Sequence, residues 1–311
     1  MAQSPARWLV AGARVAAPSP RTLVVRLRFA WRRFPYALTA VAAAPRGVAG
    51  PFRLVHGSAA RIIVERDGKR VVFRRLKPAA AVRAFRDEKL DEAPVPIGDV
   101  DSLRSEFDVR ARTLLGLDVV VFGDNIDSRL RRVYWETAAR GDYQALLGTS
   151  MALDLLAAGA KPDPAAFRRA LRAISKLPRI LVRIARPPQL DYGADILYGQ
   201  WREAGLGPVL VRPGRPADAR FERLLAPYPQ AEALPAALVL GASLRPRAAL
   251  LDALARVNQK NGLATVDREL RATAQVIPVA WVTDARLVSP RLVGWREDLL
   301  GDVDYSGVKV R

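Results

Sequence analysis

The stretch ILVRIARPPQLDYGADILYGQWREAGLGPVLV (Ile180–Val211) decides the fold class, because its hydrophobic period changes twice. The short apolar run Ile180–Ile184 is typical of a strand, and Pro208–Val211 is a second such run. Between them one helical face recurs, at Ala194, Leu197 and Trp201. Gly205 and Gly207 mark the end of this helix. A strand, a helix and a strand in this order predict a parallel sheet, and hence an α/β fold.

Further elements of the same kind lie on both sides of this unit. The run LDVVVF (Leu117–Phe122) is largely apolar, which suits a strand buried on both faces. Asp67-Gly68 separates two β-rich runs and predicts a hairpin, and Asp163-Pro164 predicts the start of a helix. We also expect strands at Thr22–Phe29, Ala236–Leu240 and Val276–Val282, and helices at Pro35–Ala44, Pro78–Asp91, Pro216–Leu225, Arg247–Val257 and Leu263–Gln275.

The composition is that of a globular protein with a large positive charge. Half of the 311 residues are hydrophobic and 26% are charged, which is too apolar for a disordered chain. The formal net charge of +19 invites a nucleic-acid interpretation. Only seven of the 50 basic residues are lysines, however, and the arginines are spread along the chain rather than gathered in one stripe. Because Arg, Ala and Pro all have GC-rich codons, we favour genome composition as the explanation.

The sequence predicts no membrane span. The longest uncharged apolar stretches, Tyr36–Pro45 and Ala233–Leu244, are shorter than the ~20 residues that a spanning helix needs. The first residues do not resemble a signal peptide, because Arg14 interrupts the short apolar run WLVAGA (Trp8–Ala13). We therefore expect no export signal within this chain.

The residue types that common catalytic sites need are scarce. Cysteine is absent and His56 is the single histidine, so thiol nucleophiles, catalytic triads and the usual zinc sites are not expected. The acidic pair Asp302/Asp304 lies beside a glycine in turn-like sequence, where Asp is common. The Gly-Leu-Gly motif at 205–207 follows a helix, whereas a phosphate-binding loop follows a strand. We therefore expect no catalytic residue, no metal site and no cofactor.

Aromatic and polar residues at strand ends are the candidates for binding a ligand. Phe122 ends the apolar run Leu117–Phe122, and Asn125 lies just beyond it. Tyr192 lies where a strand passes into a helix, and in open α/β sheets ligands gather at the carboxyl ends of strands. Packing in the core is the alternative for each of these residues.

Four stretches resemble the extracellular solute-binding proteins of family 5. GPFRLV (Gly50–Val55) resembles a glycine-proline-aromatic element that opens a strand in this family. LLGLDVVVFGDN (Leu114–Asn125) is similar to the strand that crosses between its lobes, and Pro178–Val211 is similar to the strand–helix–strand unit of its second lobe. VIPVAWVTDARLVSPRLVGWREDLLGDVDYSGVKV (Val276–Val310) resembles its ending, with a proline-bearing strand, a later Gly-Trp pair and a tail with Tyr305.

The resemblance implies a two-lobed α/β fold of the periplasmic-binding-protein type (type II), with mixed sheets. Lobe one would comprise residues 1–121 and 242–311, and lobe two would comprise residues 122–241. The chain would cross between the lobes at Leu117–Phe122 and again at AALVLG (Ala236–Gly241). Because members of the family are longer, we expect lobe one to lack its N-terminal part.

The resemblance also implies a function, the capture of peptides or similar small solutes for an ABC importer by hinge closure and without catalysis. The expected partners are the ligand and the permease subunits, but not nucleic acid, and the protein would be an extracytoplasmic monomer. The residues able to face a cleft between the lobes are Phe122, Asn125, Gln189, Tyr192 and Ser243. The many arginines favour an acidic ligand group. The alternatives are a basic protein that binds nucleic acid or another partner, and a cytoplasmic α/β enzyme.

Overall fold

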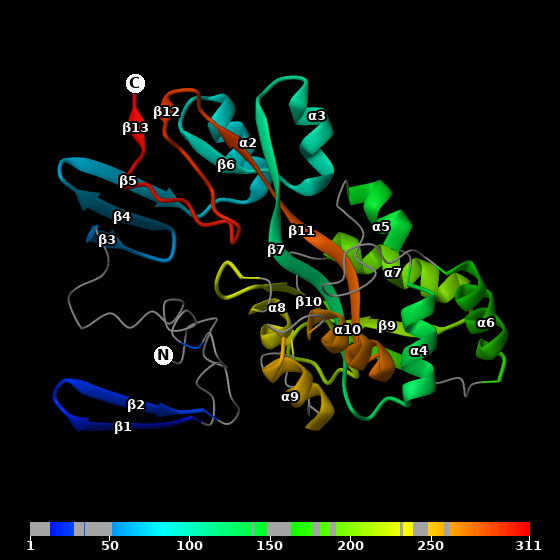
Figure 1. Ribbon diagram of the computed structural model, residues 1–311. Helices are drawn as coiled ribbons and strands as arrows, with labels where there is room; N and C mark the ends of the chain where they lie inside the picture. The colour runs from blue at the N-terminus through cyan, green and yellow to red at the C-terminus, as the bar shows by residue number, and fades with distance from the viewer. Residues whose placement is uncertain are drawn as a thin grey trace. The chain divides into compact units, whose positions relative to one another are not determined.

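The computed structural model describes residues 13–27, 34, 52–138, 140–147, 163–176, 181–186, 191–230, 233–238, 248–257 and 262–311. The chain divides into two compact units. Unit 1 comprises Met1, Ala42–Leu114 and Thr283–Arg311, and unit 2 comprises Ala2–Val41 and Leu115–Val282. Two long strands, β7 (Val109–Phe122) and β11 (Val276–Val288), each continue from one unit into the other (Figure 1).

The largest sheet has six strands in the order β6-β11-β7-β10-β8-β9. Within unit 1, β6 (Glu92–Pro94) is antiparallel to the last residues of β11. Within unit 2, the remaining strands are β10 (Ala219–Leu225), β8 (Leu181–Ala185) and β9 (Gly207–Val211). Because β10 is antiparallel to β7 and parallel to β8, and β8 is parallel to β9, the sheet is mixed, as expected.

The strand–helix–strand unit predicted for Ile180–Val211 is confirmed. β8 pairs in parallel with β9 along its whole length. α7 (Asp191–Glu203) joins the two strands and buries its predicted apolar face, which includes Leu197 and Trp201. The Trp201 ring lies edge-on to the ring of Tyr134, with 4.9 Å between their centroids. The burial of such large side chains is the main favourable term in forming the core of unit 2.

The other described helices of unit 2 are α4 (Ser128–Glu136), α5 (Arg140–Leu147), α6 (Pro164–Ile174), α8 (Ala233–Ala236), α9 (Ala248–Ala255) and α10 (Gly262–Thr273). Asp163 is the N-cap of α6, as predicted, and its carboxylate accepts a hydrogen bond of 2.8 Å from the N–H of Ala165. Asp127 caps α4 in the same way, through the N–H of Arg129 at 2.7 Å. Within the part of the chain that the structure describes, no helix is long and apolar enough to cross a membrane.

Unit 1 contains a three-stranded antiparallel sheet, formed by β3 (Arg53–Gly57), β4 (Arg61–Arg66) and β5 (Lys69–Arg74). Asp67 and Gly68 make the turn between β4 and β5, which confirms the predicted hairpin. Both residues have positive φ, 48° and 76°, a conformation that Asp and Gly tolerate better than other residues.

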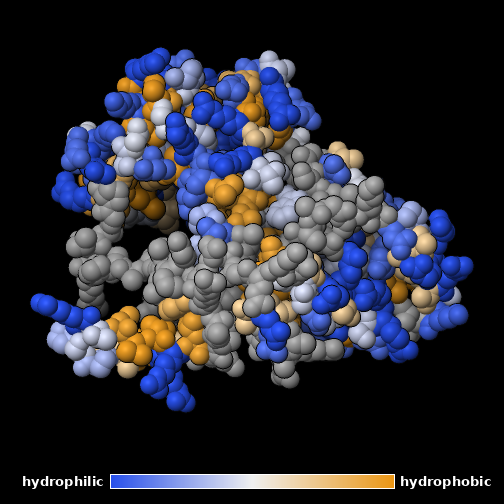
Figure 2. Space-filling model, in the orientation of Figure 1, coloured by the Kyte–Doolittle hydropathy of each residue, from blue (hydrophilic) through white to orange (hydrophobic). Residues whose placement is uncertain are grey.

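Short elements complete unit 1. They are α2 (Pro78–Arg86), a 3-10 turn (Ile97–Asp99), α3 (Val100–Arg104), β12 (Leu292–Val293) and β13 (Lys309–Val310). α2, α3 and β6 share one apolar cluster with Ala285 and Leu287 of β11. In unit 2, a separate hairpin is formed by β1 (Arg14–Ser19) and β2 (Thr22–Arg26). It exposes Val15, Leu23 and Val24 to solvent, and its surface is partly hydrophobic in Figure 2.

Two of the predicted elements are wrong. Residues Pro216–Leu225 hold strand β10 and no helix. Ala219 and Phe221 are buried and the residues between and after them are not, which is the period of a strand. The predicted strand Ala236–Leu240 begins at the last residue of α8, and the chain is still helical at Ala237 and Leu238, the last residues described there. The alanines and leucines described there are all buried, so the sequence shows the period of neither element.

The second strand that continues between the units is β11. The crossing predicted at Ala236–Gly241 lies partly outside the described residues and stays a prediction. The chain passes from unit 1 to unit 2 after Leu114 in β7, and it returns after Val282 in β11. These points differ from the lobe bounds given above, and the lobes themselves, 1–121 with 242–311 and 122–241, stay a prediction. The helix predicted for Pro35–Ala44 lies outside the described residues.

Candidate functional site

Each unit has a cavity. The one in unit 1 measures about 360 Å³, and the one in unit 2 is larger, at about 540 Å³. The loop after β7, the first turn of α4, and strands β8 and β9 form its walls. Its lining residues are Asn125, Ile126, Asp127, Leu130, Leu181, Arg183, Val209 and Asp218. Leu181 and Arg183 alternate along β8 with the buried Val182 and Ile184, so the cavity lies on the face of β8 that turns away from the core.

Asp218 organises the polar side of this cavity. Its carboxylate accepts hydrogen bonds from Nε and Nη2 of Arg183 at 3.1 and 3.2 Å, and from the backbone N–H of Arg183 at 2.9 Å. A fourth bond, of 3.0 Å, comes from Nδ2 of Asn125. The two-pronged pair with Arg183 holds the pKa of Asp218 below its usual value, and the other donors lower it further.

This arrangement suits binding rather than proton transfer. Asp218 stays ionised near neutral pH and all its donors come from the protein, so it fixes Arg183 and Asn125 in place and is no general base. Half of the Arg183 side chain remains exposed. Together with the apolar Leu181 and Val209, it offers a ligand a guanidinium beside a hydrophobic wall.

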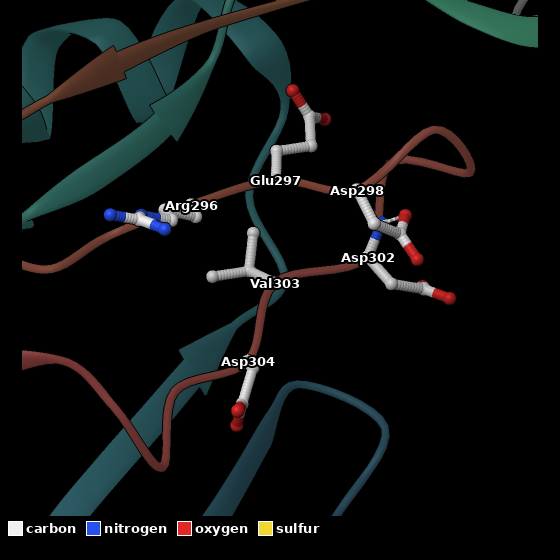
Figure 3. A pocket seen from close by; sticks show the side chains of 6 residues that line it. All are labelled: Arg296, Glu297, Asp298, Asp302, Val303 and Asp304. Carbon is white, nitrogen blue, oxygen red and sulfur yellow. Dashed lines mark hydrogen bonds between the residues drawn. The ribbon is translucent and has the colours of Figure 1, made fainter.

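The cavity in unit 1 measures about 360 Å³ and is lined by Arg296, Glu297, Asp298, Asp302, Val303 and Asp304. Figure 3 shows that the Glu297 carboxylate points away from those of Asp302 and Asp304. Because these carboxylates do not converge, they do not form a cation site. No group of three or more metal-ligating side chains is found among the residues that the structure describes.

The structure brings together few of the residues predicted to contact a ligand. Asn125 lines the larger cavity. Phe122 is buried in the core of unit 2, where its ring lies 5.5 Å from that of Tyr134, centroid to centroid. Tyr192 lies in the first turn of α7, its side chain not described, and Gln189 and Ser243 lie outside the described residues. The role of all five residues therefore stays a prediction.

Sequence reasoning missed the pair of Arg183 and Asp218. The residues are 35 positions apart, and they meet because β10 lies beside β8 in parallel, with Ala219 opposite Ile184. The region Pro216–Leu225 was predicted as a helix, and this error hides the pairing. The alternation of Ala219 and Phe221 was the available signal for a strand.

Comparisons with known proteins identify the fold. No family model and no curated protein sequence matches the chain. Among solved structures, the murein tripeptide binding protein MppA of Escherichia coli matches with a TM-score of 0.77 and 16% identity over 99% of this chain and 80% of that one. A periplasmic oligopeptide-binding protein of Borrelia burgdorferi matches with a TM-score of 0.78 and 10% identity, over 96% and 75%.

OppA of Haemophilus influenzae, in complex with the peptide RPPGFSPFR, matches with a TM-score of 0.76 and 14% identity, over 95% and 74% of the two chains. This chain has the fold of periplasmic peptide-binding proteins. The two-lobed α/β architecture expected from the sequence is thereby confirmed. Because the identities are low, the likeness shows the fold alone, and this chain spans three quarters to four fifths of the length of these proteins.

Proposed function

We propose that the protein is a solute-binding component of an ABC importer, of family 5, that captures peptides or similar small solutes without catalysis. The likeness in fold to peptide-binding proteins over at least 95% of this chain carries the proposal. The four stretches that resemble family 5 lie in the same order along the sequence. A location outside the cytoplasm and a partnership with permease subunits follow from this proposal.

The two strands that continue between the units support hinge closure as the mode of capture. β7 and β11 are neighbours in one sheet, so the two connections that these strands make between the units lie side by side. Two adjacent strands can bend together while the compact bodies at their ends stay rigid. Hinge closure through β7 and β11 is therefore part of the proposal.

The charge of the chain bears on the ligand class. A net charge of +19 and an exposed Arg183 favour a ligand with a carboxylate over a cationic ligand. Asn125 can both donate to and accept from a peptide main chain. We therefore propose peptides or acidic small molecules as the ligands.

Calorimetric titration of the purified chain with pooled peptides tests the proposal. We expect saturable binding of peptides, with weaker binding of polycationic ones. Asn125→Ala and Tyr192→Ala locate the ligand, because the two residues lie in different places. Asn125 bonds to Asp218, which also holds Arg183 of β8, whereas Tyr192 follows the carboxyl end of that strand. Gln144→Ala, on the exposed surface of α5, is the matched control and should bind like the wild type.

Two results would count against this function. One is an absence of binding to every peptide pool at millimolar concentration. The other is tight binding of duplex DNA whose affinity falls steeply with salt, which is the behaviour of a protein that neutralises phosphates. Wild-type affinity in both Asn125→Ala and Tyr192→Ala would leave the function standing but show that the ligand binds elsewhere.

A further inference from the structure

Three carboxylates surround one guanidinium in unit 1. Arg286 of β11 donates from Nε to Asp284 and from Nη1 to Glu92, each at 2.7 Å. Its Nη2 lies 3.3 Å from Oε1 of Glu297. None of the four side chains is more than 26% exposed, and Glu297 is only 5% exposed. At this depth, charges interact more strongly than they do at the surface.

This cluster holds one segment of the chain, the acidic loop (residues 296–304), against the strands of unit 1. Nη2 of Arg286 donates to the carbonyl of Gly301 at 2.7 Å. Arg112 of β7 donates to the carbonyl of Glu297, and a single β-bridge joins Glu297 to Val303 across the loop. The loop thus depends on contacts made by Arg286 and Glu297.

The charges of the cluster do not balance when every carboxyl group is ionised. Glu92 is well satisfied, because it also accepts hydrogen bonds from the indole N–H of Trp295 at 2.7 Å and the hydroxyl of Tyr305 at 2.8 Å. Glu297 is less well satisfied, since among the described residues its buried Oε1 has no hydrogen-bond partner. Nη2 of Arg286 lies 2.7 Å from Oδ2 of Asp284 and 3.3 Å from Oε1 of Glu297, so the two carboxyl groups are neighbours at one nitrogen. A proton on Glu297 would let it donate to Asp284, and would leave two carboxylates for Arg286.

The groups around Glu297 shift its pKa in opposite directions. Burial, together with the neighbouring Asp284, raises the pKa of Glu297 to about 7, although Arg286 and Arg112 oppose the shift. Arg110 of β7 lies over the ring of Trp295, with 5.2 Å between its Cζ and the ring centroid.

We propose that Glu297, Asp284 and Arg286 form a proton-dependent latch that docks the acidic loop on β11. With one proton shared by the two carboxyl groups, the loop is held. Without it, Asp284 and Glu297 repel each other and the loop is released. Asp284 is the second residue of β11 inside unit 1, so the latch acts where this strand enters the unit. The inference does not depend on the ligand or on the proposed transport function.

The sign of the effect follows from linkage. The folded-state pKa of Glu297 lies above its unfolded value of 4.5, so the docked loop binds a proton more tightly than the released loop does. The latch therefore contributes fully below about pH 4.5, and this contribution is lost as the pH rises to about 7. The loop is docked in acid and loosened in mild alkali.

Hydrogen exchange of the acidic loop (residues 296–304) in the full chain, corrected for the intrinsic pH dependence of exchange, measures the docking. Between pH 5.5 and pH 8 the opening of the loop should increase roughly 30-fold, the ratio given by a pKa of about 7 when docked and 4.5 when released. Glu297→Gln keeps a donor toward Asp284 at every pH, so its protection should stay constant over this range. Asp284→Asn removes the repelling charge, so the midpoint should move toward acid.

The matched control is Asp302→Asn, which removes the same charge from the exposed side of the same loop and should behave as the wild type. Direct titration of the Glu297 carboxyl by carbon NMR covers the case in which a variant fails to fold. A wild-type loop with constant protection, a Glu297→Gln loop that keeps the pH dependence, an unmoved midpoint in Asp284→Asn, or a Glu297 carboxyl that titrates near 4.5 would each overturn the latch.

Discussion

Gly116 stands where β7 enters unit 2, and replacing it by alanine should destabilise the protein. In the register of the sheet it lies opposite Leu225 of β10. A Cβ at this position would lie 2.8 Å from the carbonyl oxygen of Leu224, whereas ordinary contacts begin at 3.4 Å. The same Cβ would lie 2.5 Å from Cδ2 of Leu225 and 3.2 Å from Cγ2 of Val282.

The size of the effect follows from what can move. A leucine methyl group can rotate away, but a backbone carbonyl in a paired strand cannot, so β7 and β10 must separate locally by roughly 0.6 Å. The separation strains the adjacent hydrogen bond of 2.8 Å from the N–H of Ala226 to the carbonyl of Leu115. Overpacking of this kind costs about 1–3 kcal/mol. We expect Gly116→Ala to lower the free energy of unfolding by this amount.

Urea unfolding measures the loss, and hydrogen exchange of the Ala226 amide locates it. Gly199→Ala is the matched control, since Gly199 lies within α7 and a Cβ there would meet nothing within 4 Å. This control should raise the free energy of unfolding by about 0.5–1 kcal/mol, because alanine favours a helix over glycine. If Gly116→Ala proved as stable as the wild type while Gly199→Ala behaved as expected, the close approach of β7 and β10 would be refuted.

Three further variants test other parts of unit 2. Trp201→Ala should lower the free energy of unfolding by about 3–5 kcal/mol, because it empties a fully buried site against Tyr134; a loss below 1 kcal/mol in calorimetric unfolding would contradict this. Tyr134→Phe should leave stability unchanged or raise it by about 1 kcal/mol, since among the described residues the buried hydroxyl has no hydrogen-bond partner; a clear loss would reveal one. Asp218→Asn should cost about 1–3 kcal/mol at pH 7, because its bonds to Arg183 are charge-assisted. The folded pKa of Asp218 is depressed, so this cost should shrink as the pH falls below the unfolded value of 3.8; urea midpoints that stay equally far apart at pH 7 and pH 3 would count against the pairing.

The sequence predicts those elements whose signal is local. The strand–helix–strand unit at Ile180–Val211, the turn at Asp67-Gly68 and the cap at Asp163 each depend on residues within a few positions of one another, and the structure confirms all three. The sequence predicts a helix in place of β10 because Pro216 suits the first position of a helix. The burial of alternate residues in β10 arises only when a neighbouring strand lies beside it. The segment Ala236–Leu240 is apolar throughout, and such a segment shows no period at all.

The candidate site was harder to predict than the fold, because its residues are distant in sequence and meet only through the register of neighbouring strands. Phe122 and Asn125 are three residues apart, yet the sheet directs them differently: Phe122 faces the core beside Tyr134, while Asn125 bonds to Asp218 at the cavity. The position of Asn125 is set by β10, whose first residue pairs with Phe122 on one side and with Ile184 of β8 on the other. The same pairing aligns Arg183 with Asp218. One error in the assignment of a strand therefore hides the pairing of a guanidinium with a carboxylate that both line the cavity. Asn125, predicted as an isolated polar residue at a strand end, is better understood as one member of a group that Asp218 holds together.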